Sequence, residues 1–210
     1  MKQTIRIAAF LLVAGLASNV QAETFRSGKD YEQLAFPQAV ETGSQVEVRE
    51  FFWYGCPHCY AIEPSLSHWL KSLPKNASFV RTPGTYQPWQ FLGRVYYSIE
   101  SLGLVDKLHK PIFDAIHRDK RRLNSLDEVT AVVEAHGVKK ADFIKAYNSF
   151  GVRLKMKRAI QINTDFDVRS VPNFVVDGKY RTSASLAGSD ERTMQVLDYL
   201  IKKAASERKK

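Results

Sequence analysis

Residues 46–60, VEVREFFWYGCPHCY, carry the strongest fold signal in the chain. Residues 46–54 are rich in β-branched and aromatic side chains, which is typical of a β-strand. Gly55 ends this pattern. Pro57 suits the first turn of a helix, because the N–H that it lacks has no partner there. A helical pattern continues from Pro57 to about Leu73, just before a second proline. The stretch therefore predicts a strand, a short turn and a helix.

The two cysteines of the chain stand at the predicted start of this helix, in the sequence Cys56-Pro57-His58-Cys59. Free backbone N–H groups and the helix dipole favour negative charge at a helix N-terminus. We therefore expect Cys56 to ionise below the ordinary thiol pKa, and a protonated His58 to be a main source of oxidising power. Cys59 lies deeper in the helix and is expected to be buried and inert. The spacing predicts that Cys56 exchanges disulfides and that Cys59 resolves the mixed disulfide.

Two other interpretations of the cysteine pair are weaker. A purely structural disulfide would close a very small loop and would constrain the unfolded chain little. A zinc site would need two further ligands, and no cysteine remains to supply them. The remaining histidines, His68, His109, His117 and His136, form no ligand-spaced pair. We therefore expect redox catalysis by a Cys56–Cys59 disulfide, with no metal and no other cofactor.

Glu50 is a second unusual feature of the strand. Counted by twos, it shares a face with Val48 and Phe52, and a carboxylate on an apolar face is expensive to ionise. One hypothesis is a proton relay for the buried thiol of the pair, six residues further on. The other is a salt bridge to Arg81 on a neighbouring strand, with Glu63 nearby. The two hypotheses are compatible.

The rest of the chain changes pattern twice. A short strand at residues 79–81 is followed by helical patterns from Pro88 to about Asp165, one of them opened by the capping box of Ser125 and Glu128. A hairpin over residues 173–181 and a last helix after Gly188 complete the chain. We predict an α/β fold: one α/β domain made of residues 23–86 and 168–210, with residues 87–167 inserted as an all-helical domain.

The N-terminus has the pattern of an export signal. Residues 1–22 combine a positive start, a short apolar run and small residues before a cleavage point. Removal of this segment leaves a mature chain without a second hydrophobic segment, which is expected to be soluble in an oxidising periplasm.

The composition excludes several other classes of protein. The chain has 210 residues, of which 44% are hydrophobic and 25% charged, as in an ordinary globular protein. Lys and Arg number 31 against 22 Asp and Glu, which gives a formal net charge of +9. Basic residues cluster at residues 118–122 and in the C-terminal tail. An exported protein rarely meets nucleic acid, so we interpret these clusters as solvated surface and expect no nucleic-acid partner.

The quoted residues resemble a known family. The sequence from Glu50 to Tyr60, the helical insert, and Val171-Pro172 followed by residues 175–180 look like the periplasmic thiol:disulfide oxidases of the DsbA type, in the thioredoxin superfamily. The Pro-His pair between the cysteines is the specific element. The resemblance implies a thioredoxin-like domain with an inserted helical domain.

The resemblance also implies roles for particular residues and partners. Val171-Pro172 would carry a cis bond that faces Cys56, although propensity alone does not predict cis. The backbone of Val171 would pair with an extended substrate. Newly exported, unfolded proteins with free thiols would be the substrates, and a quinone-linked membrane protein of the DsbB type would reoxidise the enzyme, which we expect to be a monomer. Glu50, Glu63 and Arg81 align with charged residues near the family's active site. Residues 83–89 show no family motif, so the substrate groove there is undefined.

Two rivals to this function remain. An isomerase or reductase would use the same cysteines, but only about 23 mature residues precede the first strand, too few for the separate dimerisation domain that would suggest an isomerase. A metal chaperone would use both thiolates as ligands. A measurement of the redox potential distinguishes an oxidase from an isomerase or reductase. Metal analysis under reducing conditions distinguishes it from a metal chaperone.

Overall fold

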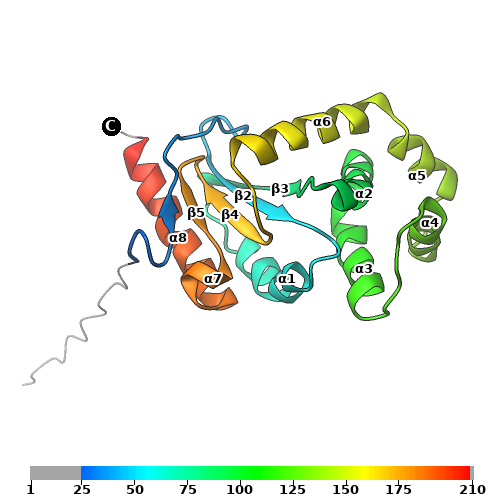
Figure 1. The fold of residues 1–210 in the computed structure, drawn as a ribbon, viewed down its shortest axis with the longest axis horizontal. Coiled ribbons are helices and arrows are strands. Elements are labelled where there is room, and N and C mark those ends of the chain that lie inside the picture. Colours follow the sequence, from blue (N-terminus) through cyan, green and yellow to red (C-terminus); the bar gives the residue numbers. More distant parts are fainter. Residues whose placement is uncertain (1–24, 209–210) are drawn as a thin grey trace, which may run out of the picture.

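The computed structural model describes residues 25–208 (Figure 1). The export signal predicted at residues 1–22 lies outside the described residues. In the part of the chain that is described, no helix combines the length and the apolar character needed to cross a membrane.

A five-stranded sheet lies at one end of the described structure (Figure 1). Its strands are β1 (Glu32–Gln33), β2 (Val46–Phe52), β3 (Ala77–Pro83), β4 (Asn173–Val176) and β5 (Tyr180–Thr182). Their spatial order is β1-β5-β4-β2-β3, and only the β2–β3 pair is parallel. In this register Glu50 stands opposite Arg81 on β3 and Phe174 on β4. β2 is an inner strand, and all of its residues are buried.

Helices cover both faces of the sheet. On one face, Val48 packs in a core with Leu66 of α1 (Pro57–Leu70) and Leu197 of α8 (Asp190–Glu207). On the other face, Phe51 packs in a smaller core with Ile162, near the end of α6 (Phe150–Asp165). Because β2 is buried on both faces, its charged residues Glu47, Arg49 and Glu50 are buried as well, and each forms an ion pair.

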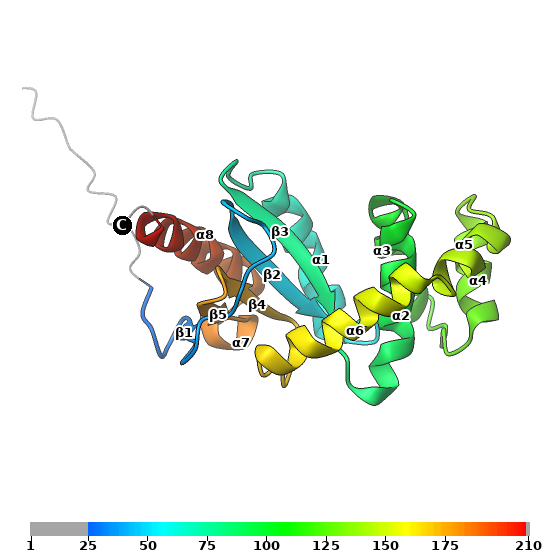
Figure 2. The same cartoon turned by 90° about the horizontal axis from the view of Figure 1, so that it is seen from above.

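A block of helices follows β3 and precedes β4, and it forms the other end of the molecule (Figures 1 and 2). Its members are η1 (Gln87–Trp89), α2 (Gln90–Ser101), α3 (Val105–His117), α4 (Leu126–Ala135), α5 (Lys140–Tyr147) and α6. The core of this block is continuous with Phe52, Tyr54 and both cysteines, so the sheet and the helices meet at the end of β2. The block is therefore part of the surroundings of the cysteines.

Most sequence-predicted elements are present, with shifted ends. The capping box of Ser125 and Glu128 is formed as expected. The hairpin of β4 and β5 turns at Asp177 and Gly178, both with positive φ, which is the reason for the Asp-Gly pair. The predicted strand over residues 46–54 ends earlier, at Phe52, and the helix predicted to about Leu73 ends at Leu70. β1 and the short helix α7 (Ala184–Ala187) were not predicted, since two and four residues carry no readable periodicity. The two-domain division at residues 87–167 stays a prediction.

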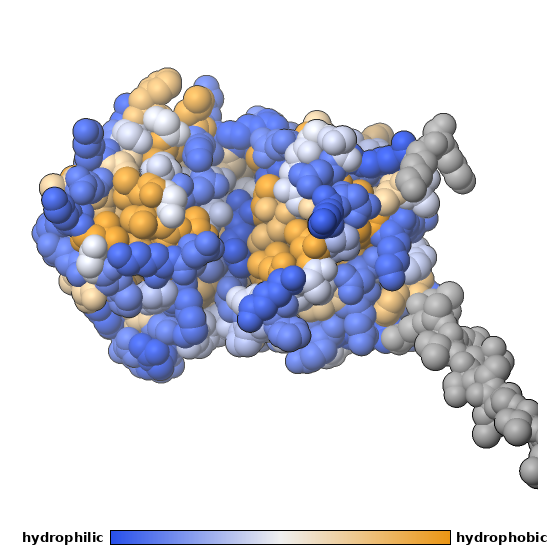
Figure 3. All heavy atoms as spheres, turned by 180° about the vertical axis from the view of Figure 1, so that it is seen from behind, coloured by the Kyte–Doolittle hydropathy of each residue, from blue (hydrophilic) through white to orange (hydrophobic). Residues whose placement is uncertain are grey.

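The surface of the described part is mostly hydrophilic. Seen from behind, hydrophobic residues gather in two patches, one over the helical end and one nearer the sheet, with hydrophilic side chains between them (Figure 3). Phe36 and Phe150 are the most exposed large apolar side chains, at 79% and 71%. They lie in separate parts of the sequence and do not form the cysteine site.

Candidate active site

Cys56 occupies the N-cap position of α1. Its backbone is extended, with φ −87° and ψ 117°, and its Sγ accepts a hydrogen bond from the backbone N–H of Cys59 at 3.4 Å. Pro57 is the first residue of the helix, where its missing N–H leaves no bond unmade. The Sγ–H of Cys56 also donates to the carbonyl oxygen of Val171 at 3.4 Å. The sulfur is thus held between a helix N-terminus and a backbone carbonyl.

This position lowers the pKa of the Cys56 thiol to about 6. The largest cause is a hydrogen bond from the Cys59 thiol. Burial opposes it, and backbone N–H groups of Cys59 and His58 follow. The charge of His58 comes last among these causes, and its ring is exposed to water that screens it. Cys59 and the helix terminus therefore come before His58 among the causes, and the expectation that His58 is a main source of thiolate stabilisation stays a prediction.

Cys59 has the opposite environment. Its exposed fraction is 0%, and both cysteines are free thiols in this structure. Burial in apolar surroundings raises the pKa of Cys59 far above the ordinary thiol value, and its neighbour Cys56 raises it further. Cys59 therefore stays protonated when Cys56 is a thiolate.

The peptide bond between Val171 and Pro172 is cis. The resemblance implied this isomer, whereas propensity did not predict it. A cavity of about 350 Å³ adjoins this bond and is bounded on the other side by His58. Further lining residues are hydroxyl side chains and one carboxylate, Ser170, Ser183, Ser185 and Asp190. Val171, whose carbonyl accepts from the Cys56 thiol, thus also lines a polar hollow.

Glu50 is fully buried, and its charge is among the causes that raise the pKa of Cys59. Arg81 donates from Nε to its Oε2 at 2.8 Å, while Oε1 has no hydrogen-bond partner among the described residues. Burial raises the pKa of Glu50 to about 7. Arg81 opposes this rise, and the charge of Glu63 adds to it. The salt bridge to Arg81 is therefore present, and a carboxyl that titrates near neutral pH is also compatible with the relay hypothesis.

Arg81 is shared by two carboxylates. Its Nη2 donates to Oε1 of Glu63 at 3.4 Å, in addition to its bond to Glu50. Burial disfavours the ionised form of Glu63, but hydrogen bonds from His109 and Arg81 keep its pKa below the ordinary value. The structure thus brings together all three charged residues singled out from the sequence.

Two members of this cluster were missed from the sequence, His109 and Tyr54. His109 of α3 contacts Glu63 through Nε2 at 3.2 Å and the hydroxyl of Tyr54 through Nδ1 at 2.8 Å. His109 shares the buried stripe of its helix with Ile112 and Phe113, three and four residues further on. That stripe was the available signal, but periodicity does not show which strand or helix the stripe faces.

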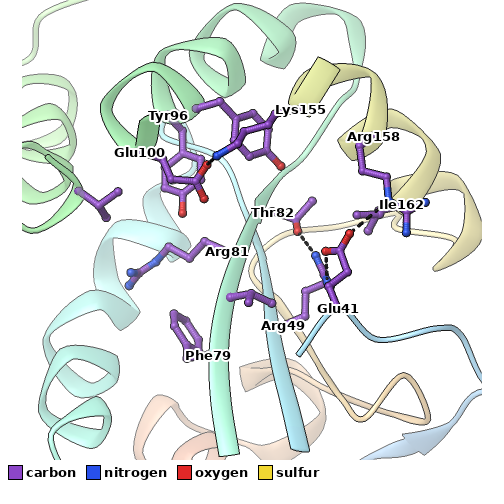
Figure 4. A pocket seen from close by; sticks show the side chains of 13 residues that line it. Glu41, Arg49, Phe79, Arg81, Thr82, Tyr96, Glu100, Lys155, Arg158 and Ile162 are labelled. Carbon is purple, nitrogen blue, oxygen red and sulfur yellow. Dashed lines mark hydrogen bonds and ion pairs between the residues drawn. The ribbon is translucent and has the colours of Figure 1, made fainter. Parts of the chain in front are cut away.

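Arg81 also lines a cavity of about 440 Å³ on the outer side of β3 (Figure 4). Tyr96 lies across this cavity from Phe79, and Lys155 forms an ion pair with Glu100 at its rim. The cavity also adjoins a second polar cluster that the sequence analysis missed, in which Arg49 bonds to Glu41, Glu47 and Thr82. The Glu50–Arg81 pair is buried, yet Arg81 borders solvent-filled space on this side.

Aromatic side chains border the cysteine loop in the segment left undefined from the sequence. Trp53 stacks on Trp89 with centroids 4.8 Å apart and planes 12° apart, and Tyr86 packs edge-on against Trp89. The hydroxyl of Tyr86 donates to the carbonyl oxygen of Val168. Residues 83–89 therefore form an aromatic wall beside the active-site turn. Within the described residues, no group of three or more His, Cys, Asp or Glu side chains is arranged to hold a metal ion.

Comparisons with known proteins give one consistent result. The family model described as "DSBA-like thioredoxin domain" matches residues 89–202. Thiol:disulfide interchange protein DsbA of Pseudomonas aeruginosa is 36% identical over 211 residues, covering 100% of both chains. The protein of the same name from Pseudomonas syringae pv. tomato is 38% identical over 200 residues, covering 94% of each. The crystal structure of Pseudomonas aeruginosa DsbA superposes with a TM-score of 0.84 at 37% identity, over 89% of this chain and 97% of that one. NmDsbA1 of Neisseria meningitidis follows with a TM-score of 0.79 at 25% identity, over 88% and 96%.

Proposed function

Because the chain belongs to the DsbA family of thiol:disulfide interchange proteins, it is a thiol:disulfide oxidoreductase, and we propose that it donates its Cys56–Cys59 disulfide to newly exported proteins in the periplasm. The observation that carries the direction of transfer is the environment of Cys56, whose thiolate is stabilised at the N-cap of α1. A stabilised thiolate favours the reduced enzyme, and this makes the disulfide a strong oxidant.

The transfer proceeds in two exchange steps. A substrate thiolate attacks Sγ of Cys56, which forms a mixed disulfide and breaks the Cys56–Cys59 bond. The electron pair of the broken bond stays on Cys59, which takes up a proton because its burial disfavours the thiolate. A second substrate thiolate then attacks the substrate sulfur of the mixed disulfide and releases Cys56 as a thiolate. The substrate has lost two electrons and gained a disulfide, and the enzyme is reduced.

Glu50 is the proton donor for Cys59 in this proposal. The carboxyl is fully buried, its charge influences the pKa of Cys59, and its own pKa is about 7, so the protonated and ionised forms are both accessible near neutral pH. In the first step it gives its proton to the leaving Cys59 thiolate, and during reoxidation it takes the proton back. The positive charge of Arg81 lowers the pKa of Glu50, and the negative charge of Glu63 raises it.

The hollow beside the cis bond suggests how substrate binds. The carbonyl of Val171 accepts a hydrogen bond from the Cys56 thiol, and Val171 and Pro172 line the hollow, so an extended, unfolded segment that enters the hollow would meet their backbone next to the reactive sulfur. His58 and Pro57 are exposed at the rim and would contact the substrate chain next to its cysteine. This mode suits substrates that have not yet folded.

The remaining features of the proposal come from the sequence and from the family. Residues 1–22 direct export to the periplasm, and the protein acts there as a monomer. A quinone-linked membrane protein of the DsbB type reoxidises the cysteine pair. The redox-active disulfide takes the place of a bound cofactor, and nucleic acid is not a partner.

Trapping of the mixed disulfide tests the proposed roles. Cys59→Ala cannot form the Cys56–Cys59 disulfide, but its Cys56 thiolate can attack a disulfide of a substrate protein, releasing one substrate thiolate. The mixed disulfide should accumulate, because Cys59 is not present to attack it from the enzyme side. Cys56→Ala is the matched control and should trap nothing, because Cys59 is buried. Non-reducing gels of exported proteins measure both. Adducts on both variants, or on neither, would contradict the assignment.

A redox titration against glutathione tests the direction of transfer. An oxidase should be more oxidising than the glutathione couple, whereas a reductase would be more reducing. Metal analysis of the protein purified under reducing conditions tests the chaperone alternative, which requires about one equivalent of bound metal.

A further inference from the structure

A chain of side-chain contacts runs from the active-site turn to the buried carboxyl. The hydroxyl of Tyr54 lies 2.8 Å from Nδ1 of His109, and Nε2 of His109 lies 3.2 Å from Oε1 of Glu63. Arg81 bonds to the same oxygen of Glu63 at 3.4 Å and to Oε2 of Glu50 at 2.8 Å. These residues come from the turn after β2, from α3, α1, β3 and β2, so five separate segments meet in one network.

The chemistry of the groups fixes the direction of each bond. Burial lowers the pKa of His109, so its imidazole is neutral at neutral pH. A neutral imidazole has one donor and one acceptor nitrogen, and an ionised carboxylate only accepts. Nε2–H therefore donates to Glu63, and Nδ1 accepts from the hydroxyl of Tyr54. Both hydrogen bonds of His109 are satisfied in a single tautomer.

Other titratable groups around His109 leave this arrangement intact. The ring of Tyr96 on α2 packs edge-on at 6.0 Å between centroids, and it does not replace Glu63 as the partner of Nε2. Lys110, the next residue of α3, directs its Nζ to Asp114 at 2.6 Å. Arg81 is the cation that reaches Glu63, and Arg81 is also bound by Glu50.

We propose that His109 is a positioning residue that holds Glu63 in its ionised form against Arg81, so that Glu50 is the carboxyl of the pair that exchanges a proton with Cys59. This inference rests on the proposed function. One guanidinium serves two carboxylates, and whichever carboxylate has the additional donor keeps its charge more easily. His109 supplies that donor to Glu63, while Oε1 of Glu50 has no partner among the described residues.

The pH dependence of Cys59 chemistry is the direct consequence. The leaving Cys59 thiolate needs a protonated Glu50, so the step slows as the pH rises through the pKa of Glu50, which is about 7. Without His109 the pKa of Glu63 rises, its charge near Glu50 is lost, and Arg81 turns to Glu50. The pKa of Glu50 then falls, because the charge of Glu63 raises it in the native protein.

The rate at which dithiothreitol reduces the oxidised enzyme, measured by rapid mixing at a series of pH values, tests the inference. Rates are corrected for the thiolate fraction of the reductant. In a plot of the corrected reduction rate against pH, the wild-type rate should begin to fall near pH 7, and we call this point the bend. Glu50→Gln should remove the bend. His109→Phe keeps a ring but loses both hydrogen bonds, so its bend should move to lower pH by about one unit. Above the bend the rate should fall about tenfold. His109→Gln keeps an amide N–H donor and should restore most of the native profile.

A control and a double mutant separate this role from a merely structural one. His117→Phe alters another histidine of α3, which contacts the carbonyl of Tyr54 and no carboxylate, and it should leave the bend unchanged. Glu63→Gln should move the bend to lower pH by itself, and adding His109→Phe to it should cause no further shift. An unchanged bend in His109→Phe, an equal shift in His109→Gln, or additive shifts in the double mutant would overturn the inference. Glu63→Gln provides the test if His109→Phe does not fold.

Carboxyl titration by NMR with labelled glutamate gives a readout that is independent of activity. In the reduced wild-type protein Glu63 should ionise at lower pH than Glu50. The difference between the pKa values of the two carboxyls should become smaller in His109→Phe. If the wild-type enzyme exchanges no disulfides, the proposed function fails, while the titration still reports whether His109 controls the carboxyl pair. If exchange occurs and the difference between the two pKa values does not change, only the inference about His109 fails.

Discussion

At the scale of the residue, two identical side chains three positions apart have opposite acid–base properties. Cys56 caps α1 and receives hydrogen bonds from the Cys59 thiol and from backbone N–H groups, which lower its pKa. Cys59 lies one turn inside the helix, where burial raises its pKa. A disulfide between them therefore breaks asymmetrically, because one sulfur leaves readily as an anion and the other requires a proton.

His58→Ser tests how the stabilisation of Cys56 is divided. The substitution removes an exposed charge but keeps the backbone N–H of residue 58. The Cys56 pKa should therefore rise by about one unit, equivalent to roughly 30 mV of oxidising power, and it should stay below the ordinary thiol range. Ultraviolet thiolate absorbance during a pH titration measures the pKa, and His68→Ser, in the last turn of α1, is the matched control. A Cys56 that titrates as an ordinary thiol in His58→Ser would show that the imidazolium is the main source.

At the scale of the element, the turn between β2 and α1 determines where the sulfur lies. The backbone N–H of Cys56 donates to the carbonyl of Trp53 at 2.9 Å, which closes the turn. A Cβ at Gly55 would lie 2.3 Å from the indole of Trp53, and that indole stacks on Trp89. Glycine is required here because the ring covers the turn, and the aromatic stack ties the turn to residues 83–89.

Gly55→Ala tests this link between the turn and the aromatic wall. The added methyl group must displace the ring of Trp53, so we expect a loss of about 1–3 kcal/mol in stability, as for other overpacked sites. Tryptophan fluorescence should change as well, because the ring of Trp53 is displaced. The Cys56 pKa should shift, because Cys56 is the N-cap of α1 and follows the turn that moves. Denaturant unfolding measures the first effect. Gly151→Ala, in helix α6, where a Cβ meets nothing within 4 Å, is the control: it should leave the fluorescence and the Cys56 pKa near the native values and should not lower the stability, because Ala is favoured over Gly in a helix.

At the scale of the whole molecule, the site is built where the two ends of the described structure meet. The sheet supplies Glu50 and Arg81, α1 supplies the cysteines and Glu63, and the helical block supplies His109 from α3. Phe52 and Tyr54 pack in one core with residues of that block. The redox state of the cysteine pair is therefore coupled to the stability of the entire fold.

Unfolding of the two redox forms as a function of pH tests this coupling. In the reduced protein the Cys56 pKa is about 6, below its ordinary value of 9.0, so its thiolate stabilises the fold fully above pH 9. This stabilisation is lost as the pH falls from about 9 to about 6, with a slope of at most about 1.4 kcal/mol per pH unit. The oxidised protein has no thiol to titrate.

The stability of the reduced form relative to the oxidised form should therefore increase between about pH 6 and pH 9. Above pH 9 the trend should reverse, because Cys59 has a raised pKa and keeps its proton in the fold while it would lose it in the unfolded chain. Denaturant melts of both redox forms at several pH values give the difference directly. A difference that does not change with pH would show that Cys56 has no depressed pKa.

The local elements of the site and its reactive cysteine pair could be predicted from the amino-acid sequence alone. A β-branched and aromatic run, a glycine and a proline are local signals, and they place Cys56 at a helix start without knowledge of the rest of the chain. The position of Glu50 in its strand also indicated a buried carboxyl. Side chains alternate between the two faces of a strand, so Glu50 shares a face with Val48 and Phe52.

Most partners of these groups depend on how distant segments pack, and the sequence suggested only Arg81 for Glu50 and, through the family resemblance, Val171 for Cys56. His109 is separated by 46 residues from Glu63, and Val171 by 115 from Cys56, so no periodic pattern links them. The balance of effects on the Cys56 pKa likewise depends on burial and on the hydrogen bond from Cys59, which the sequence does not show. Local signals come from the conformational preferences of neighbouring residues. Hydrogen-bond partners and pKa values are set by whichever distant segments pack against them.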